Sequence, residues 1–333
     1  MRDSERSLVE AVLRRVVPDA RRVRNRQDHL VPEYVSCNLC GADDARLLYK
    51  ARDHRLRIDD RVWNVVQCRR CSLGYLNPRP TAAESGSYYP EAYFCPRAEM
   101  SGRYELEAGY VPGAPGDLLD IGAARGDFMA VMRDRGWRVS GIEPSTNGNP
   151  HGLDIRRQRF PEDCDLEPES FDVVTAWAVF EHLHNPLSAF RRAASLIRPG
   201  GCLIVQVPNL RSINARYARL EDIPRHLYFF SPATLARYAT LSGLLVDQIH
   251  HTTDLHGGSG RGVLRRLLIH ALGGDDEAFF DFYALRRRQR FRAAPLRATA
   301  WTLTGALETV LLADPLVKAL RISGEVVAVM RRR

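Results

Sequence analysis

Apolar and polar positions alternate in blocks along residues 117–250. Five short stretches are almost continuously apolar, as strands buried on both faces of a sheet are; they span residues 118–121, 139–143, 171–177, 202–207 and 244–249. Amphipathic segments separate them over residues 128–135, 186–197 and 231–242, each followed within three residues by a glycine, which is typical of a helix end. This alternation predicts an α/β fold with a mostly parallel sheet.

A last strand is predicted over residues 324–330, so residues 251–322 form an insertion before it. The insertion contains a basic run over residues 286–292 and an apolar stretch over residues 301–313. A membrane-spanning helix needs about 20 apolar residues, whereas this stretch is shorter and Glu308 interrupts it. We therefore expect a helical insertion that covers the sheet. Peripheral contact with a membrane surface, or with a second subunit, is the alternative.

The chain before residue 117 divides into three parts. Residues 1–33 lack the uninterrupted apolar core of a secretory signal and predict an N-terminal amphipathic helix. Residues 34–76 combine cysteine pairs with β-prone stretches, and residues 77–116 form a connector with several prolines and tyrosines. Residues 117–333 carry the sheet and the insertion. Without an export signal we expect a cytoplasmic protein whose thiols stay reduced.

Four of the seven cysteines form two C-x-x-C pairs, Cys37 with Cys40 and Cys68 with Cys71, separated by 27 residues. Two such thiolate pairs can hold a zinc ion tetrahedrally, each from one tight turn. Because four thiolates leave no open coordination position, the predicted zinc is structural. Chance placement or a redox role would be a fair alternative for one pair, but the second pair favours the metal.

The segment over residues 118–128 joins the first strand of the predicted sheet to its helix. Gly122 and Gly126 allow a tight turn and a close approach of the backbone to a ligand. A dinucleotide-binding loop would need glycine where Ala124 and Asp127 stand, and a phosphate-binding G-K-[ST] is absent. The loop therefore predicts a ligand that has no pyrophosphate.

Two acids end the first two strands, Asp120 and, 23 residues later, Glu143. A carboxylate at the second place can accept hydrogen bonds from both ribose hydroxyls of an adenosine ligand. A loop that carries a carboxylate also suits the ammonium group of a methionine tail. These positions favour an adenosine ligand without phosphates.

The loop resembles the first motif of class I S-adenosylmethionine-dependent methyltransferases, acid-x-Gly-x-Gly-x-Gly. Asp120, Gly122 and Gly126 match this motif, and Ala124 replaces its middle glycine. Further matches follow in the family's order at Glu143, residues 171–183 and residues 198–205. The resemblance implies a Rossmann-like, mostly parallel seven-stranded sheet and S-adenosylmethionine as the cofactor.

The same resemblance assigns four further side chains. It implies that Trp177 lies near the methionine part of the cofactor and Phe160 near the adenine. Glu181 and His182 are expected to help form the cofactor pocket. For Trp177 and Phe160, ordinary core packing is the alternative.

The whole layout resembles a bacterial subgroup of these enzymes, with two zinc knuckles, a connector that contains Asn77-Pro-Arg-Pro80 and Tyr88-Tyr89, and then the sheet. The subgroup includes sugar C-methyltransferases and methyltransferases associated with surface glycans. The sugar C-methyltransferases carry a second α/β domain, for which too few residues follow residue 250. O-methylation is therefore expected, and C-methylation is the alternative.

Residues 224–231 follow the strand over 202–207, at the carboxyl edge where such sheets bind ligands. They resemble a stretch of the same subgroup in which a histidine is the base, and His226 matches that histidine. A histidine pKa near 6.5 suits proton abstraction at neutral pH. We also expect Arg225 to hold an anionic substrate group and Tyr228 to line the pocket. The alternative is that His226 only orders the loop.

The formal net charge of +8 and the pI near 9.3 favour acidic partners without selecting among them. The expected function is S-adenosylmethionine-dependent methylation of a hydroxyl group on a small molecule or glycan. The alternative class is a zinc-ribbon protein that binds or modifies RNA. The cysteine-bearing segment has few of the basic and aromatic alternations that stack bases, so nucleic acid is not the expected partner.

Overall fold

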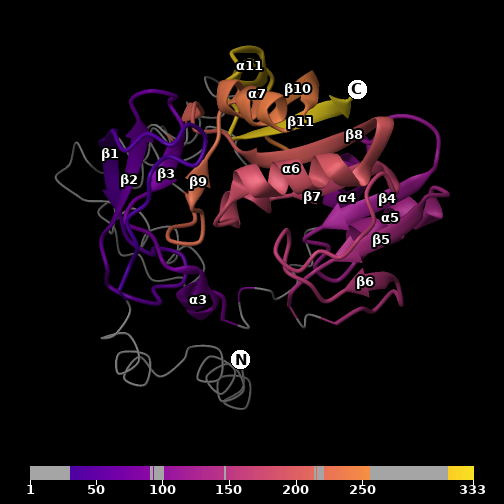
Figure 1. The fold of residues 1–333 in the computed structure, drawn as a ribbon, viewed down its shortest axis with the longest axis horizontal. Helices are drawn as coiled ribbons and strands as arrows, with labels where there is room; N and C mark the ends of the chain where they lie inside the picture. Colours follow the sequence, from indigo (N-terminus) through magenta and orange to yellow (C-terminus); the bar gives the residue numbers. More distant parts are fainter. Residues whose placement is uncertain are drawn as a thin grey trace, which may run out of the picture.

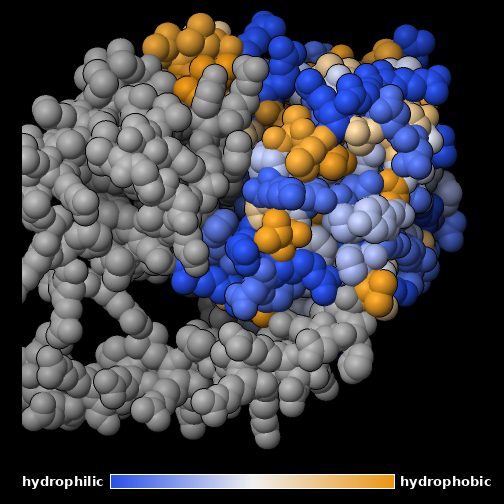
Figure 2. Space-filling view, turned by 90° about the vertical axis from the view of Figure 1, so that its left-hand side faces the viewer, coloured by the Kyte–Doolittle hydropathy of each residue, from blue (hydrophilic) through white to orange (hydrophobic). Residues whose placement is uncertain are grey.

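The computed structural model describes residues 31–90, 93, 101–145, 148–213, 215, 221–255 and 314–333. Most of the predicted N-terminal helix lies outside these residues, as do the basic run and the apolar stretch of the predicted insertion. Of the helices within the described ranges, none is long and apolar enough to cross a membrane. On the face drawn in Figure 2, hydrophobic residues are interspersed among hydrophilic ones.

The larger sheet has seven strands in the order β10-β11-β8-β7-β4-β5-β6. They are β4 (Asp117–Ile121), β5 (Arg138–Ile142), β6 (Asp154–Arg156), β7 (Phe171–Trp177), β8 (Ile197–Pro208), β10 (Leu244–Thr252) and β11 (Glu325–Arg332). Neighbouring strands are parallel except at β11, which runs antiparallel to β10 and β8. The predicted mostly parallel, seven-stranded sheet is confirmed. Only β6 was not predicted, because one residue of its three is apolar.

The three predicted helices of this region are present as α5 (Asp127–Asp134), α6 (Pro186–Leu196) and α7 (Pro232–Leu241). Figure 1 shows α6 in front of the sheet. Side-chain caps begin two of them: Asn185 Oδ1 accepts a bond of 3.1 Å from Ser188 N, and Ser231 Oγ one of 3.3 Å from Thr234 N. The other helical elements are α3 (Ala82–Ser85), η1 (Gly86–Tyr88), α4 (Ser101–Ala108), η4 (Phe180–His182) and α11 (Asp314–Ala319).

A second, antiparallel sheet holds the cysteine-bearing segment. Its strands are β1 (Ala45–Ala51), β2 (Trp63–Cys68), β3 (Gly74–Leu76) and β9 (Tyr228–Phe229), in the order β1-β2-β3-β9. The last strand comes from the region of the larger sheet, and Figure 1 shows it beside β3. The second sheet is therefore completed by a distant part of the chain.

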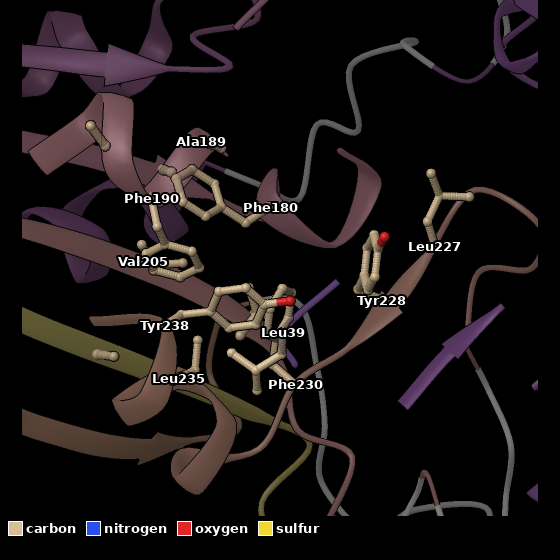
Figure 3. Packing of buried hydrophobic residues seen from close by; sticks show 14 of the residues in the cluster. Leu39, Phe180, Ala189, Phe190, Val205, Leu227, Tyr228, Phe230, Leu235 and Tyr238 are labelled. Carbon is tan, nitrogen blue, oxygen red and sulfur yellow. The ribbon is translucent and has the colours of Figure 1, made fainter. Parts of the chain in front are cut away.

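One hydrophobic core runs through both parts of the molecule. Phe190 of α6 stacks on Tyr238 of α7 with ring centroids 5.0 Å apart, and Phe230 meets the Tyr238 ring edge-on at 5.6 Å. Leu39, from the segment before β1, lies beside these rings (Figure 3) and is buried. Apolar burial of this kind is the main favourable term in folding, so the two sheets stabilise one another.

A buried ion cluster also joins the two parts. The side chain of Arg225 is fully buried, with Nη2 2.7 Å from Asp53 Oδ1 and Nε 2.8 Å from Asp222 Oδ1. Asp53 follows β1, whereas Asp222 and Arg225 precede β9. Asp222 also receives hydrogen bonds from Arg55 at 2.6 Å and from the Tyr93 hydroxyl at 3.3 Å. The buried positive charge of Arg225 is thus balanced by two carboxylates, those of Asp53 and Asp222.

Removing one carboxylate from this cluster should be costly. Asp53→Ala leaves the buried guanidinium of Arg225 with half of its counter-charge, and breaking a buried pair costs roughly 3–5 kcal/mol. The matched control is Arg331→Ala, which removes a half-exposed pair with Asp247 at 2.8 Å and should cost under about 1 kcal/mol. Urea unfolding of both variants, with Asp53→Asn as a milder change, measures the difference. Equal losses in Asp53→Ala and Arg331→Ala would contradict a special role for the cluster.

Candidate functional site

A pocket of about 720 Å³ opens at the carboxyl ends of the parallel strands. This edge is where open α/β sheets bind their ligands. Of the residues predicted from the first motif and the neighbouring strands, those that line the pocket are Asp120, Gly122, Ala124, Glu143, Phe160 and Trp177. Gly126 does not line it; this residue precedes α5 as its N-cap, with a φ of 82°.

The loop after β4 has the backbone that a glycine motif requires. Gly122 has a φ of 76°, and a Cβ there would lie 2.4 Å from Val179 Cγ2. Ala124, which replaces the middle glycine, also has a positive φ of 49°. Its N–H donates a hydrogen bond of 3.0 Å to Glu143 Oε2. The substitution therefore keeps the glycine-like conformation despite its steric cost.

Glu143 follows β5 and is held in place from two sides. Its Oε2 accepts from Ala124 N, and its Oε1 accepts a bond of 2.8 Å from Ser145 N. Asp120 lies beside it at the end of β4, and its Oδ1 accepts a bond of 2.7 Å from the Thr175 hydroxyl. Burial raises the pKa of Asp120 to about 7, although the Thr175 bond opposes this and the charge of Glu143 adds to it. The floor of the pocket is thus acidic.

Trp177 ends β7 and forms another wall of the pocket. Its ring meets Phe128 edge-on with centroids 5.3 Å apart. Its buried Nε1 has no hydrogen-bond partner among the described residues. Buried indole N–H groups usually find an acceptor, so this wall can offer a donor to a bound molecule.

Several side chains of the connector line the pocket and were not predicted. Three come from α4, namely Arg103, Tyr104 and Glu107, and two more are Tyr89 and Tyr93. The signal in the sequence was weak. Arg103 and Glu107 have the spacing of an ordinary i,i+4 ion pair on a helix surface, and only the packing of α4 against α5 turns them toward the pocket.

Two histidine rings are in contact with each other where His182 lines the pocket. The rings of His182 and His226 are 4.8 Å apart between centroids. His182 lines the pocket, and its Nδ1 lies 3.0 Å from both the Tyr89 hydroxyl and the Arg225 carbonyl oxygen. His226 is not among the described residues that line the pocket; it lies behind His182 with its Nδ1 3.2 Å from Glu221 Oε2.

Their surroundings give the two histidines opposite charge preferences. Burial and the neighbouring His226 lower the pKa of His182 to about 3. Burial also acts to lower the pKa of His226, but the Glu221 hydrogen bond and the charges of Glu181 and Asp222 raise it above the ordinary value. His182 is therefore neutral near pH 7, whereas His226 is the basic member of the pair.

The predicted substrate-binding roles of Arg225 and Tyr228 stay predictions, because both side chains have partners within the protein. Neither residue lines the pocket within the described part of the chain. The Arg225 guanidinium is already paired with Asp53 and Asp222. The Tyr228 hydroxyl accepts a bond of 2.8 Å from Arg79 Nη1 and donates one of 3.2 Å to the His184 carbonyl. Both side chains hold the two sheets together.

The four cysteines of the two C-x-x-C pairs meet at one point. Their Sγ atoms all lie within 4.8 Å of one another, with Cys37 and Cys71 3.3 Å apart and Cys40 and Cys68 3.6 Å apart. A tetrahedral zinc with Zn–S bonds of about 2.3 Å brings its sulfur atoms to roughly this separation. The donor set therefore fits a structural zinc.

The two knuckles have the same backbone geometry. Cys37 O accepts from Gly41 N at 2.8 Å, and Cys68 O accepts from Ser72 N at 3.0 Å. Gly41 and Ser72 occupy equivalent positions, with φ angles of 71° and 65°. Ser72 is a non-glycine residue in a left-handed conformation, which a metal-binding turn can hold against its local cost.

A second group, Glu181 with His182 and His226, also places one ligand atom from each residue within 4.8 Å. Glu181 is fully buried, and burial raises its pKa to about 7. The group adjoins the pocket and could carry either a proton or a cation.

Comparisons with known proteins agree with this geometry. Residues 97–249 match the family model of a methyltransferase domain. The chain is 32% identical over 150 residues to the ubiquinone biosynthesis O-methyltransferase of Aeromonas salmonicida, an alignment that covers 39% of this chain and 63% of that protein. It is 33% identical over 153 residues to the enzyme of the same name from Stutzerimonas stutzeri, covering 40% and 66%. The chain thus spans slightly less than two thirds of these relatives.

A solved S-adenosylmethionine-dependent methyltransferase from Archaeoglobus fulgidus is 13% identical, with a TM-score of 0.45 and coverage of 73% of this chain and 97% of that one. Residues 97–249 thus combine a match to the methyltransferase-domain model with most of a Rossmann-like, mostly parallel sheet. The matched residues do not include the cysteine pairs.

The cysteine site leads to a prediction about metal. Purified protein is expected to contain about one zinc per chain, measured by elemental analysis. Cys37→Ser and Cys68→Ser should each remove a ligand and lower the thermal midpoint and the solubility, because metal binding is coupled to folding. Cys164→Ser, which changes a partly buried thiol outside the cluster, is the control. Metal-free protein of full stability would refute the zinc site, and a second equivalent of metal would direct attention to Glu181 and the two histidines.

Proposed function

We propose that the protein transfers a methyl group from S-adenosylmethionine to a hydroxyl oxygen of a small molecule or glycan, and that zinc holds its N-terminal sheet. One observation carries the proposal. A single pocket is lined at one place by the loop after β4 with Glu143, and at another by His182, which lies against His226. The cofactor loop and His182 thus share one pocket, and the proposed base His226 is in ring contact with His182.

The residues of the loop fit the cofactor. Gly122 lines the pocket, and the Cβ that it lacks would lie 2.4 Å from Val179 Cγ2, so glycine lets the loop and Val179 pack together here. The fixed carboxylate of Glu143 can accept hydrogen bonds from the two ribose hydroxyls. The Trp177 Nε1 donor and the Phe160 ring add a polar and an apolar wall. The bound cofactor supplies a methyl group on a positively charged sulfur. The protein's part is to align that group with the acceptor.

His226 is proposed as the general base. The acceptor oxygen must lose a proton as it gains the methyl group, and a histidine with a raised pKa accepts it more readily than His182 does. Glu221 Oε2 lies 3.2 Å from His226 Nδ1 and orients the His226 ring. Neutral His182 and the Tyr89 hydroxyl are placed to orient the acceptor.

The side chains that line the pocket and the names of the relatives indicate the kind of molecule that accepts the methyl group. Tyr89, Tyr93, His182 and His184 give this end of the pocket aromatic faces with polar tips, which suits a hydroxylated ring such as a sugar or a phenol. The relatives are named as O-methyltransferases of ubiquinone biosynthesis, which favours oxygen over carbon as the acceptor atom. A sugar C-methyltransferase is the second candidate, and it is supported by the zinc knuckles alone.

The first prediction here concerns the cofactor. Calorimetry should detect binding of S-adenosylmethionine and S-adenosylhomocysteine but not of NAD. Glu143→Ala should weaken binding by about 1.5–3 kcal/mol, since two ribose hydroxyls lose a charged acceptor. Asp154→Ala, an exposed acid of β6, is the matched control and should leave the affinity unchanged. Unchanged affinity in Glu143→Ala would remove Glu143 from the cofactor site.

The second prediction concerns the base. His226→Ala should slow methyl transfer by roughly 10²–10⁴-fold while cofactor affinity stays nearly intact. His251→Ala, whose Nδ1 lies 3.2 Å from the Ser323 hydroxyl, is the control. Only the neutral form of His226 can accept a proton, so the rate should rise as pH rises through the pKa of His226. Because its carboxylate neighbours raise that pKa, the midpoint of this rise should lie above the ordinary histidine pKa of about 6.5.

Glu221→Gln provides the internal check on this assignment. It removes a carboxylate that raises the pKa of His226, so the acid limb of the rate profile should move to lower pH. Equal losses of cofactor affinity and rate in His226→Ala would mean that the residue is structural. A pH profile that Glu221→Gln does not move would place the base elsewhere.

A further inference from the structure

Glu107 of α4 is a buried carboxyl group that the proposed reaction does not yet use. It lines the pocket, and the residue is 1% exposed. Neither of its carboxylate oxygens has a hydrogen-bond partner among the described residues. Arg103 Nε, one helical turn away, lies 3.0 Å from Glu107 Oε1, without the geometry of a hydrogen bond.

A buried carboxylate without hydrogen bonds destabilises the folded protein. An unsatisfied buried carboxylate costs more free energy than a neutral group, so it either finds a partner or holds a proton. Burial raises the pKa of Glu107 to about 8, Arg103 opposes this, and Asp120 adds to it. Near neutral pH the empty pocket therefore holds Glu107 largely in its neutral form.

The charged groups around Glu107 define what it can bind. Arg103 lies on the same helix, and the charge of Asp120 at the end of β4 raises the pKa of Glu107. Asp127 of α5 is occupied by His151 at 2.8 Å, and Glu143 acts on Asp120 in turn. Asp120, Glu143 and Glu107 all line the pocket. Their carboxyl groups favour a bound cation that can donate hydrogen bonds.

We propose that Glu107 binds the α-ammonium group of the methionine part of the cofactor, and that cofactor binding displaces a proton from Glu107. This inference rests on the proposed cofactor. The ammonium has three N–H donors for the oxygens that Glu107 leaves without a hydrogen bond, whereas Glu143 serves the ribose at the end of the neighbouring strand. A cation beside a carboxyl group favours its ionised form, so the proton of Glu107 goes to the solvent as the ion pair forms.

The test counts protons. S-adenosylhomocysteine is titrated into the full-length protein at pH 6.5 in buffers of different ionisation enthalpy, and the dependence of the measured heat on the buffer gives the protons released. We expect about one proton per ligand for the wild type, since a group with a pKa of about 8 is almost fully protonated at this pH. Glu107→Gln should release close to none and bind roughly tenfold or more weakly.

Two controls make the result specific. Glu105→Gln changes an exposed acid of the same helix, paired with Arg135 at its surface, and should behave as the wild type. 5′-Methylthioadenosine keeps the adenosine but has no ammonium group, and it should bind wild type and Glu107→Gln equally without proton release. S-adenosylmethionine should release as many protons as S-adenosylhomocysteine, because both carry the ammonium.

Three outcomes would overturn the inference. Proton release that persists in Glu107→Gln would assign it to Asp120 or another acid. Release with S-adenosylmethionine but not with S-adenosylhomocysteine would mean that the sulfonium, not the ammonium, is recognised. Release with 5′-methylthioadenosine would point to the adenosine. If none of the three ligands binds, the proposed function itself fails, which is a separate result.

Discussion

The guanidinium of Arg225 has no contact with water, because its side chain is fully buried between Asp53 and Asp222. A buried charge is tolerated only when its counter-charges are fixed around it. Arg225 therefore sets the position of the segment after β1, of the loop at residue 222 and of its own neighbour His226. The place of His226 against His182 and Glu221 follows from this contact. Folding of the cysteine-bearing part and the chemistry of the pocket are thereby coupled.

The local features of the fold could be predicted from the sequence. Strands buried on both faces need apolar side chains at successive positions, so the long strands of the larger sheet appear as apolar runs. The cysteine knuckles were likewise visible, because the two cysteines of each pair lie within one turn. β6 and β9 were not found because they have three and two residues, too few for any periodicity to be recognised.

Contacts between distant parts of the chain could not be predicted in this way. Arg225 and its partner Asp53 are 172 residues apart, and Tyr228 and Arg79 are 149 residues apart. From the sequence alone, Arg225 and Tyr228 were expected to face a substrate, because no residue close to them in the sequence indicates their partners. Glu107 shows the converse. Its spacing from Arg103 is that of a surface ion pair, and only tertiary packing brings it to the pocket.

The pairing of β3 with β9 has a consequence for the order of folding during synthesis. β3 ends at Leu76, and β9 begins at Tyr228. The N-terminal sheet therefore leaves the ribosome without its last strand, and β3 keeps an unpaired edge until that strand has been translated. An exposed strand edge is a template for pairing with other chains, and early domains fold before later ones are complete. The four cysteines of the proposed zinc site span only residues 37–71, so that site is complete in the nascent chain long before β9 is translated.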